Sequence, residues 1–283
     1  MKKLSLFTIF ILLLIILSGR FNNDYPIHLI NPFLKPGLKD VVENSLKGKR
    51  GNFAVSIKNL KTLEEYSLND SQQFDAASLY KLWVMATVFK KIQTGELTEE
   101  KIISGDIGSL NQTFGLSSED AELTEGSIDY TITEALEQMI TISHNYAAFM
   151  LTVEVTNTAI KEFLSEYKFN NSSLGPPKTT SSDLAKFFEK LYLGQIVDPA
   201  SSSKMLEILS RQKINDRIPK LLPEGTKVAH KTGDINFVEN DGGIVFSPNG
   251  DYIIVVLSET PSAPTATEDI AELSSAVYDY FSK

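Results

Sequence analysis

The chain has 283 residues, of which 42% are hydrophobic, and it carries a formal net charge of -9. This length suffices for one large domain with a sizeable core. An acidic chain without a basic cluster argues against a nucleic acid partner. The absence of cysteine excludes disulfides and thiolate chemistry, and the three histidines lack metal-ligand spacing. We therefore expect no metal and no cofactor.

The first 20 residues, MKKLSLFTIFILLLIILSGR, combine two lysines with an apolar stretch over residues 4–18. This pattern is typical of a secretory signal peptide, although Leu17 stands where a cleavage site needs a small residue. The stretch is short for a membrane span, which needs about 20 apolar residues. A cleaved signal peptide and an uncut membrane anchor both stay open. Either predicts export to the periplasm, the outer face of the cytoplasmic membrane or the extracellular space, with membrane contact only through this segment.

Residues 21–36 hold three prolines and suit a linker, which leaves residues 37–283 as one domain. Its N-terminal part predicts a short helix over residues 37–47 and then a strand pair in GNFAVSIKNLKTLEEYSLN. Its C-terminal part predicts strands in TKVAHKTG, VENDGGIVF and DYIIVVLSE, with a hairpin at Asn249-Gly250 between the last two. An amphipathic helix over residues 266–281 closes the chain.

The middle of the chain, about residues 95–225, has a helical pattern. Its strongest segment is TITEALEQMITISHNYAAFMLTVEV, and SSDLAKFFEKLYLG ends on Gly194, a C-cap signal. The run NNSSLGPPKTTSS between them predicts a loop. The expected fold is α/β of the α+β kind: an antiparallel sheet of about five strands from both chain ends, flanking helices and an inserted all-helical lobe. The junction of the two lobes is the expected place for a cleft.

One lysine stands out in the apolar run FDAASLYKLWVMATVF, where Lys81 follows Ser78 at the start of a buried helix. The chain has four S-x-x-K patterns, but the other three lie in polar contexts. A spacing of three residues puts both side chains on one helix face. Burial lowers the pKa of an amine, and a neutral amine beside a hydroxyl can act as its general base. The alternative is a lysine that extends from an ordinary core helix to solvent.

Two further motifs lie in settings that favour chemistry. Ser143-His144-Asn145 stands between the apolar segments ALEQMITI and YAAFML, although a helix-capping serine is the better explanation of this motif taken alone. Lys231-Thr232-Gly233 lies on the predicted strand TKVAHKTG, where a lysine and a hydroxyl can hold a carboxylate and glycine lets a substrate approach.

The order SxxK, SxN, KTG is the signature of serine β-lactamases and penicillin-binding proteins. Over about residues 38–282 the chain resembles the class A β-lactamase catalytic domain and its serine-hydrolase relatives. The resemblance implies that Ser78 is the acylated nucleophile, Lys81 its base and Ser143 a proton relay to the leaving nitrogen. It further implies that Asn145 orients the substrate, that Lys231, Thr232 and Gly233 bind it, and that the backbone N–H groups of Ser78 and Asp234 form the oxyanion hole.

The sequence departs from class A β-lactamases in the loop that should carry the hydrolytic glutamate. NNSSLGPPKTTSS contains no acid, and the nearest carboxylates, Glu162, Glu166 and Asp183, are expected on solvated helix faces. Asp234 follows KTG where a small or hydroxyl residue is usual, and VENDGGIVF holds no arginine for a carboxylate pocket. The resemblance therefore implies acylation by a β-lactam followed by slow deacylation.

Three functions stay open on this basis. The first is an exported serine hydrolase of the class A β-lactamase type that opens β-lactams. The second is a penicillin-binding D-Ala-D-Ala carboxypeptidase or transpeptidase that acts on peptidoglycan, and the third is a non-catalytic binding protein on the same fold. The expected partner is a small β-lactam or D-Ala-D-Ala peptide substrate, and the expected state is a monomer.

Overall fold

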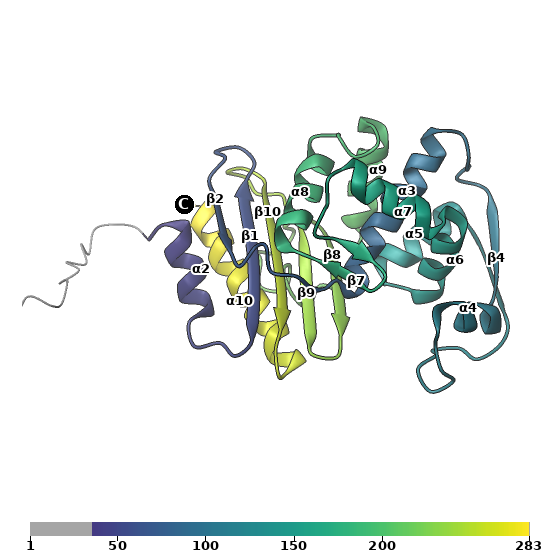
Figure 1. The fold of residues 1–283 in the computed structure, drawn as a ribbon. Coiled ribbons are helices and arrows are strands. Elements are labelled where there is room, and N and C mark those ends of the chain that lie inside the picture. The colour runs from purple at the N-terminus through teal and green to yellow at the C-terminus, as the bar shows by residue number, and fades with distance from the viewer. Residues whose placement is uncertain (1–35, 283) are drawn as a thin grey trace, which may run out of the picture. The chain divides into compact units, whose positions relative to one another are not determined.

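The structure is a computed structural model that describes residues 36–282 (Figure 1). The predicted signal or anchor segment and almost all of the predicted linker lie outside the described residues. Among the helices that the structure does describe, none is long and apolar enough to span a bilayer.

A five-stranded antiparallel sheet is built from both ends of the described chain, as the sequence predicts. Its order is β2-β1-β10-β9-β8, and every neighbouring pair is antiparallel. The strands are β1 (Asn52–Asn59), β2 (Glu65–Leu68), β8 (Val228–Ile235), β9 (Val238–Val245) and β10 (Tyr252–Glu259). The last strand of the chain thus lies between β1 and β9, at the centre of the sheet.

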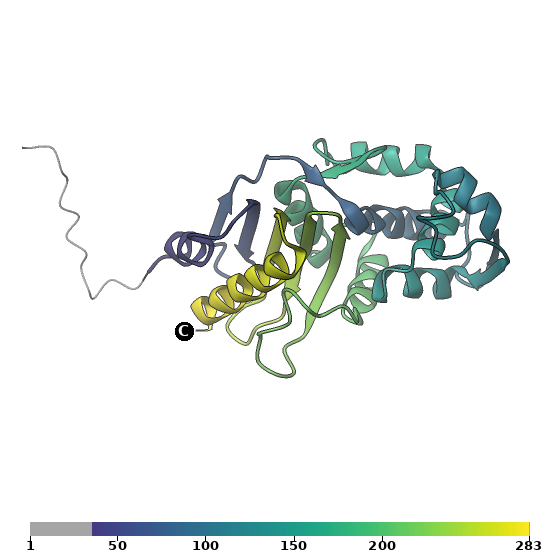
Figure 2. The ribbon, with the colours of Figure 1, turned by 90° about the horizontal axis from the view of Figure 1, so that it is seen from below.

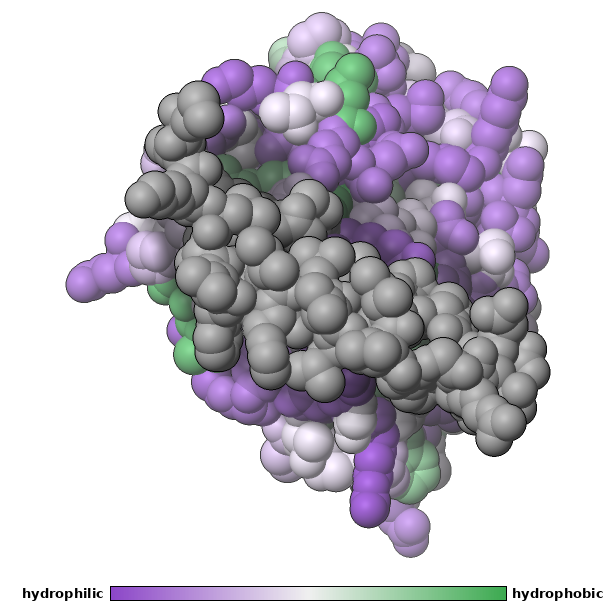
Figure 3. All heavy atoms as spheres, turned by 90° about the vertical axis from the view of Figure 1, so that its left-hand side faces the viewer, coloured by the Kyte–Doolittle hydropathy of each residue, from purple (hydrophilic) through white to green (hydrophobic). Residues whose placement is uncertain are grey.

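The two faces of the sheet are covered by different layers (Figures 1 and 2). Helices α2 (Leu38–Leu46) and α10 (Ala263–Phe281) cover one face. Successive strand residues point to opposite faces, so Ile254 and Val256 of β10 pack with this pair, whereas Val255 belongs to the larger core on the other side. The surface on the α2 side, where it is not grey, is mostly hydrophilic (Figure 3).

The other layer is mainly helical and is centred on α3. Its helices are α3 (Lys81–Gln93), α4 (Ile107–Phe114), α5 (Ile132–Thr141), α6 (Asn145–Val155), α7 (Asn157–Glu166), α8 (Ser181–Tyr192) and α9 (Pro199–Leu209). Every residue of α3 up to Phe89 is buried, as expected for a helix that is apolar on all sides. Helices α4 to α9 fall within the region, about residues 95–225, for which the sequence predicts a helical pattern.

The inserted lobe also contains short strands, which the sequence analysis did not predict. They are β4 (Ile102–Asp106) paired with β5 (Ser127–Thr131), and β6 (Ser173–Leu174) paired with β7 (Pro177–Thr179). β3 (Phe74–Asp75), which precedes α3, also pairs with β7. These strands are two to five residues long, too short for a period-2 pattern to separate them from loop.

Two helix boundaries differ from the sequence expectation, and both carry site residues. The helix expected from Ser78 starts as a 3-10 turn, η1 (Ala77–Tyr80), and becomes α-helical at Lys81. The long helical segment over residues 131–155 breaks between α5 and α6, where Ser143 has a φ of 59°. His144 caps α6, because its Nδ1 accepts a hydrogen bond from the backbone N–H of Ala147 at 3.2 Å.

Candidate active site

The turn that carries Ser78 is held by β7. The backbone N–H of Ala76 donates to the carbonyl of Pro177 at 3.0 Å, and Asp75 lies opposite Lys178 in the β3–β7 register. Ala77 has a φ of 45°, a region that costs energy for a residue with a Cβ. The half-buried Ser78 therefore sits on a strained turn immediately before α3.

Lys81 is fully buried, and its amine donates to three oxygens. Its Nζ lies 2.6 Å from the Ser143 carbonyl, 3.1 Å from Ser143 Oγ and 2.8 Å from Asn145 Oδ1. Burial lowers the pKa of Lys81 to about 7, against smaller opposing effects of nearby carboxylates. Ser78 Oγ is not among the hydrogen-bond acceptors of this amine within the described chain, and such contacts often tighten only with substrate bound.

Ser143 joins two lysines that are distant in sequence. Its Oγ accepts from Lys81 Nζ at 3.1 Å and from Lys231 Nζ at 3.0 Å. A hydroxyl oxygen has two acceptor sites and one proton. With both acceptor sites used by the amines, the Ser143 hydroxyl proton is left to donate elsewhere, and Ser143 lines the cleft.

Lys231 lies on β8 and is fully buried. Its Nζ also donates to the Thr232 carbonyl at 2.8 Å. Burial, together with the nearby charge of Lys81, lowers the pKa of Lys231 well below its ordinary value. The next residue, Thr232, is buried too, and its Oγ1 has no hydrogen-bond partner within residues 36–282. An unpartnered buried hydroxyl beside a cleft is available to a ligand.

Gly233 lets β8 approach the nucleophile turn. A Cβ at this position would lie 2.8 Å from the carbonyl oxygen of Ala76 and 3.1 Å from the backbone nitrogen of Leu79. These separations leave no room for a side chain, so the strand and the turn are in direct backbone contact. The contact brings the residue after Gly233, Asp234, to the same cleft as Ser78.

Glu122 is a site residue that the sequence analysis missed. It lies in the segment between α4 and β5, and its Oε1 accepts from Asn145 Nδ2 at 2.6 Å. Asn145 therefore receives a donor, Lys81, on one side of its amide and contacts an acceptor, Glu122, on the other. The exposed polar segment around Glu122 contains no pattern that distinguishes this carboxylate from its neighbours.

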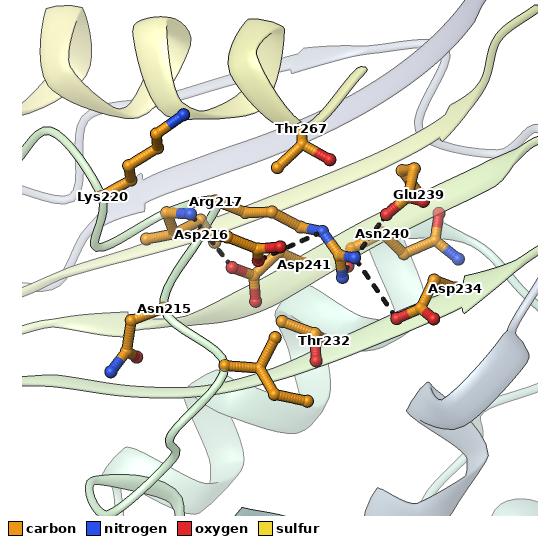
Figure 4. A network of polar contacts seen from close by, with 12 residues as sticks. Asn215, Asp216, Arg217, Lys220, Thr232, Asp234, Glu239, Asn240, Asp241 and Thr267 are labelled. Carbon is orange, nitrogen blue, oxygen red and sulfur yellow. Dashed lines mark hydrogen bonds and ion pairs between the residues drawn. The ribbon is translucent and has the colours of Figure 1, made fainter. Parts of the chain in front are cut away.

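Arg217 is the second missed residue, and Figure 4 shows it at the centre of a polar network. Its guanidinium contacts Asp234 Oδ1 at 3.3 Å, Asp216 Oδ1 at 3.7 Å and Glu239. Its Nη1 also donates to the carbonyl of Asn240 at 3.1 Å. Although VENDGGIVF holds no arginine, Arg217 reaches the end of β8 from the segment that precedes this strand. Its position in the polar stretch QKINDRIPK, shortly before KTG, was the available signal.

A buried pair on β8 and β9 holds the segment that carries Arg217. His230 Nδ1 lies 2.9 Å from Asp241 Oδ1, and His230 Nε2 lies 3.0 Å from Asn215 Oδ1. Asp241 Oδ2 also accepts from the backbone N–H of Ile218 at 3.1 Å. Residues on both sides of Arg217 are thus fixed to the sheet, which fixes the guanidinium near KTG.

The loop that replaces the expected glutamate loop is organised around Asp183. This side chain is 2% exposed, so the expectation of a solvated helix face was wrong for Asp183, whereas Glu162 and Glu166 are exposed. Asp183 Oδ2 accepts from the backbone N–H of Asn171 at 2.8 Å and from Ser172 Oγ at 3.0 Å. One oxygen of this carboxylate thus binds the loop, the other has no hydrogen-bond partner within the described residues, and Asp183 does not line the cleft.

A cleft of about 550 Å³ contains the surface-accessible part of this arrangement. Of the predicted site residues, Ser78, Ser143, Asn145 and Asp234 line it, while Lys81 and Lys231 are buried behind Ser143. Thr232 and Gly233 connect Lys231 to Asp234 on β8. Ser143 thus meets both Ser78, which is 65 residues before it, and Lys231, which is 88 residues after it.

Comparisons with known proteins agree with this geometry. Residues 36–281 match the model of the beta-lactamase enzyme family. The chain is 24% identical to beta-lactamase VEB-1 of Pseudomonas aeruginosa over 85% of its length and 89% of that protein. It is 23% identical to the extended-spectrum beta-lactamase PER-1 of Pseudomonas aeruginosa over 87% of both chains.

Solved structures show the same fold. A beta-lactamase from Sphaerobacter thermophilus superposes with a TM-score of 0.77 and 22% identity, over 87% of this chain and 97% of that one. PBP-A superposes with a TM-score of 0.75 and 25% identity, over 86% and 95%. With the family model covering nearly all described residues, this chain belongs to the beta-lactamase enzyme family and is a serine hydrolase of the β-lactamase kind.

Proposed function

We propose that the protein is an exported serine enzyme that β-lactams acylate at Ser78 and that releases the acyl group slowly. The observation that carries the proposal is the hydrogen-bonded set Lys81–Ser143–Lys231, which lies beside Ser78 at the cleft. It supplies a low-pKa amine, a hydroxyl with a free proton and a second amine within one contact network.

In the acylation step, Ser78 Oγ attacks the β-lactam carbonyl carbon and its proton passes to the neutral Lys81 amine. The new Oγ–C bond forms, and the ring C–N bond breaks as Ser143 donates its proton to the leaving nitrogen. Lys81 then returns a proton to Ser143, to which it already donates. The backbone N–H groups of Ser78 and Asp234 would stabilise the negative charge on the carbonyl oxygen, and losing one such donor costs about 10²–10³ in rate.

The deacylation step needs a base that activates water against the Ser78 ester. The loop over residues 170–180 contains no acid, and the buried Asp183 behind it is bonded to Asn171 and Ser172. A general base contributes about 10²–10⁴ in rate, so its absence predicts a long-lived acyl-enzyme.

Intact-mass spectra after mixing with benzylpenicillin would test both steps. We expect an adduct equal to the mass of the intact penicillin, which persists after excess drug is removed, and no adduct on Ser78→Ala. No adduct on the folded wild-type protein would overturn acylation, and rapid turnover without an accumulating adduct would overturn slow deacylation.

A D-Ala-D-Ala carboxypeptidase acting on peptidoglycan is the second candidate. The acid-free loop and the likeness to PBP-A favour it. Incubation with a diacetyl-Lys-D-Ala-D-Ala peptide would release D-alanine from the wild type and not from Ser78→Ala. A third candidate, a binding protein that uses the fold without chemistry, requires that Ser78→Ala leave its biological effect intact.

Export rests on the lysine-flanked apolar segment over residues 4–18. Labelling fractionated cells with a fluorescent penicillin would locate the acylated protein outside the cytoplasm. The mass of the labelled protein separates the two forms, because signal cleavage removes about the first 20 residues and an anchor keeps them.

A further inference from the structure

We propose that Asp234 makes this cleft selective for acyl donors that carry a cationic group near the bond to be broken. The inference rests on the proposed acylation of Ser78 and names the class of donor that reacts best. Two observations support it. The charged side chains that line the cleft are carboxylates, and the nearby arginine already contacts several carboxylates.

Carboxylates are the only charged side chains that line the cleft within the described chain. They are Asp75, Glu122 and Asp234, and neither lysine nor arginine is among the lining residues. Asp75 is compensated by Lys178, whose Nζ lies 2.7 Å from Asp75 Oδ1. Within residues 36–282, the neutral Asn145 amide is the only hydrogen-bond donor to the Glu122 side chain. The accessible charge of the cleft is therefore negative.

The cation nearest to Asp234 is already shared among acids. The Arg217 guanidinium is 4% exposed and contacts Glu239, Asp234 and, at 3.7 Å, Asp216 (Figure 4). One positive charge thus faces three carboxylates. Burial raises the pKa of Glu239, Arg217 opposes this rise, and the neighbouring Asp234 and Asp216 add to it. Arg217 has little charge left to attract an anionic substrate group.

Asp234 is the member of this network that a substrate meets. Its side chain is 57% exposed, whereas those of Arg217 and Glu239 are 4% and 8% exposed. It follows Gly233 directly, so it stands where the strand contacts the nucleophile turn. A cation on the donor would gain from Asp234, while an uncompensated carboxylate there would be repelled.

Cephalothin and cephaloridine are a matched pair of probes for this inference. They share the acyl side chain and the ring carboxylate, but cephalothin has a neutral acetoxy group on the C3 methylene and cephaloridine a pyridinium cation. The rate constant of acylation is read from the loss of unmodified protein in intact-mass spectra at low salt, because ring opening can expel either group.

We expect the wild type to react faster with cephaloridine, and Asp234→Asn to lower the cephaloridine-to-cephalothin rate ratio about 2–5-fold, the range of an exposed ion pair. Asp234→Glu keeps the charge and should keep the ratio. Glu162→Gln, which removes one charge on the exposed face of α7, is the control for net charge. Added salt should shrink the wild-type preference toward that of Asp234→Asn.

Two different failures are distinguishable. If neither drug acylates folded wild-type protein, the proposed function fails. If both acylate it but the ratio is the same in wild type and Asp234→Asn, or is unchanged by salt, the selectivity inference fails while the proposed function stands. Circular dichroism of each variant shows whether it is folded.

Discussion

The two walls of the cleft differ in what they offer to a serine ester. On the wall formed by α3, the α5–α6 break and β8, amines from two distant segments converge on Ser143 Oγ. On the opposite wall β7 contributes Pro177 to the cleft, and the buried carboxylate behind it, Asp183, is bonded to its own loop. We infer that forming an acyl-enzyme and hydrolysing it depend on separate parts of this fold, so one can be present without the other.

The largest expected effect comes from the first wall. Lys81→Met keeps most of the side-chain volume and removes the amine, so acylation by benzylpenicillin should fall about 10²–10⁴-fold, the usual contribution of a general base. Stopped-flow or quenched mass spectrometry would measure the rate.

Lys213→Met is the matched control, because Lys213 also ends an S-x-x-K pattern but is exposed. It should leave the acylation rate unchanged. Equal acylation rates for Lys81→Met and wild type would show that Lys81 is not the general base and that the first wall has only a structural role.

The pH dependence of acylation is the next effect in size. Because the pKa of Lys81 is lowered from 10.5 to about 7, the amine is neutral above pH 7 and charged below it. The acylation rate should therefore fall about tenfold per pH unit below 7 and level off above, as for any base that must be deprotonated. Rates measured from pH 5.5 to 8.5 would contradict this if they were flat.

The same shift has a consequence for stability. Between pH 7 and 10.5 the unfolded chain holds the Lys81 proton and the folded chain does not, so this group makes stability rise with pH across that window. Thermal midpoints at each pH would separate a loss of rate from a loss of fold.

A carboxylate introduced on the second wall should speed hydrolysis of the acyl-enzyme. Pro177 lines the cleft, and its carbonyl binds the residue two positions before Ser78. We expect Pro177→Glu to shorten the lifetime of the acyl-enzyme about tenfold, below the contribution of a fully positioned base. Pro177→Gln has nearly the same shape without the charge and should keep the wild-type lifetime. If both variants behave alike, charge on this wall does not limit deacylation.

Asp183→Asn should have the smallest effect on chemistry. Losing the charged acceptor for Asn171 and Ser172 in a buried site should lower the free energy of unfolding by about 1–3 kcal/mol. The acylation rate and the acyl-enzyme lifetime should both stay within about twofold of wild type. Denaturant unfolding and mass spectra would measure them, and a marked change in lifetime would show that Asp183 takes part in deacylation after all.

The sheet and the fold class could be predicted from sequence because their signals are local. The alternation in β1, the apolar run of β10, the Asn249-Gly250 turn and the helical periods each lie within one segment. The 3-10 turn at Ser78 was missed, because no glycine or proline marks it. A capping serine would place a helix start at Ser143, but the structure caps α6 with His144, and Ser143 has a φ of 59°. The short strands β6 and β7 depend on pairing that no single segment reveals.

The site was predictable to the extent that its residues belong to motifs with fixed spacing. Ser78 with Lys81, Ser143 with Asn145, and Lys231 with Thr232 each fall within four positions of one another. Glu122 and Arg217 act across distances of 23 residues to Asn145 and 17 to Asp234, which spacing does not constrain. Their roles follow from charge in three dimensions, which the spacing of residues along the chain does not reveal.

The absent side chain at position 233 also limits how this enzyme can evolve. A single methyl group there would overlap the carbonyl of Ala76, so β8 and the serine turn keep their contact only with glycine at this position. A change in the acyl donors that fit the cleft is therefore expected at other lining residues, such as Phe149, Ile214 and Ile235.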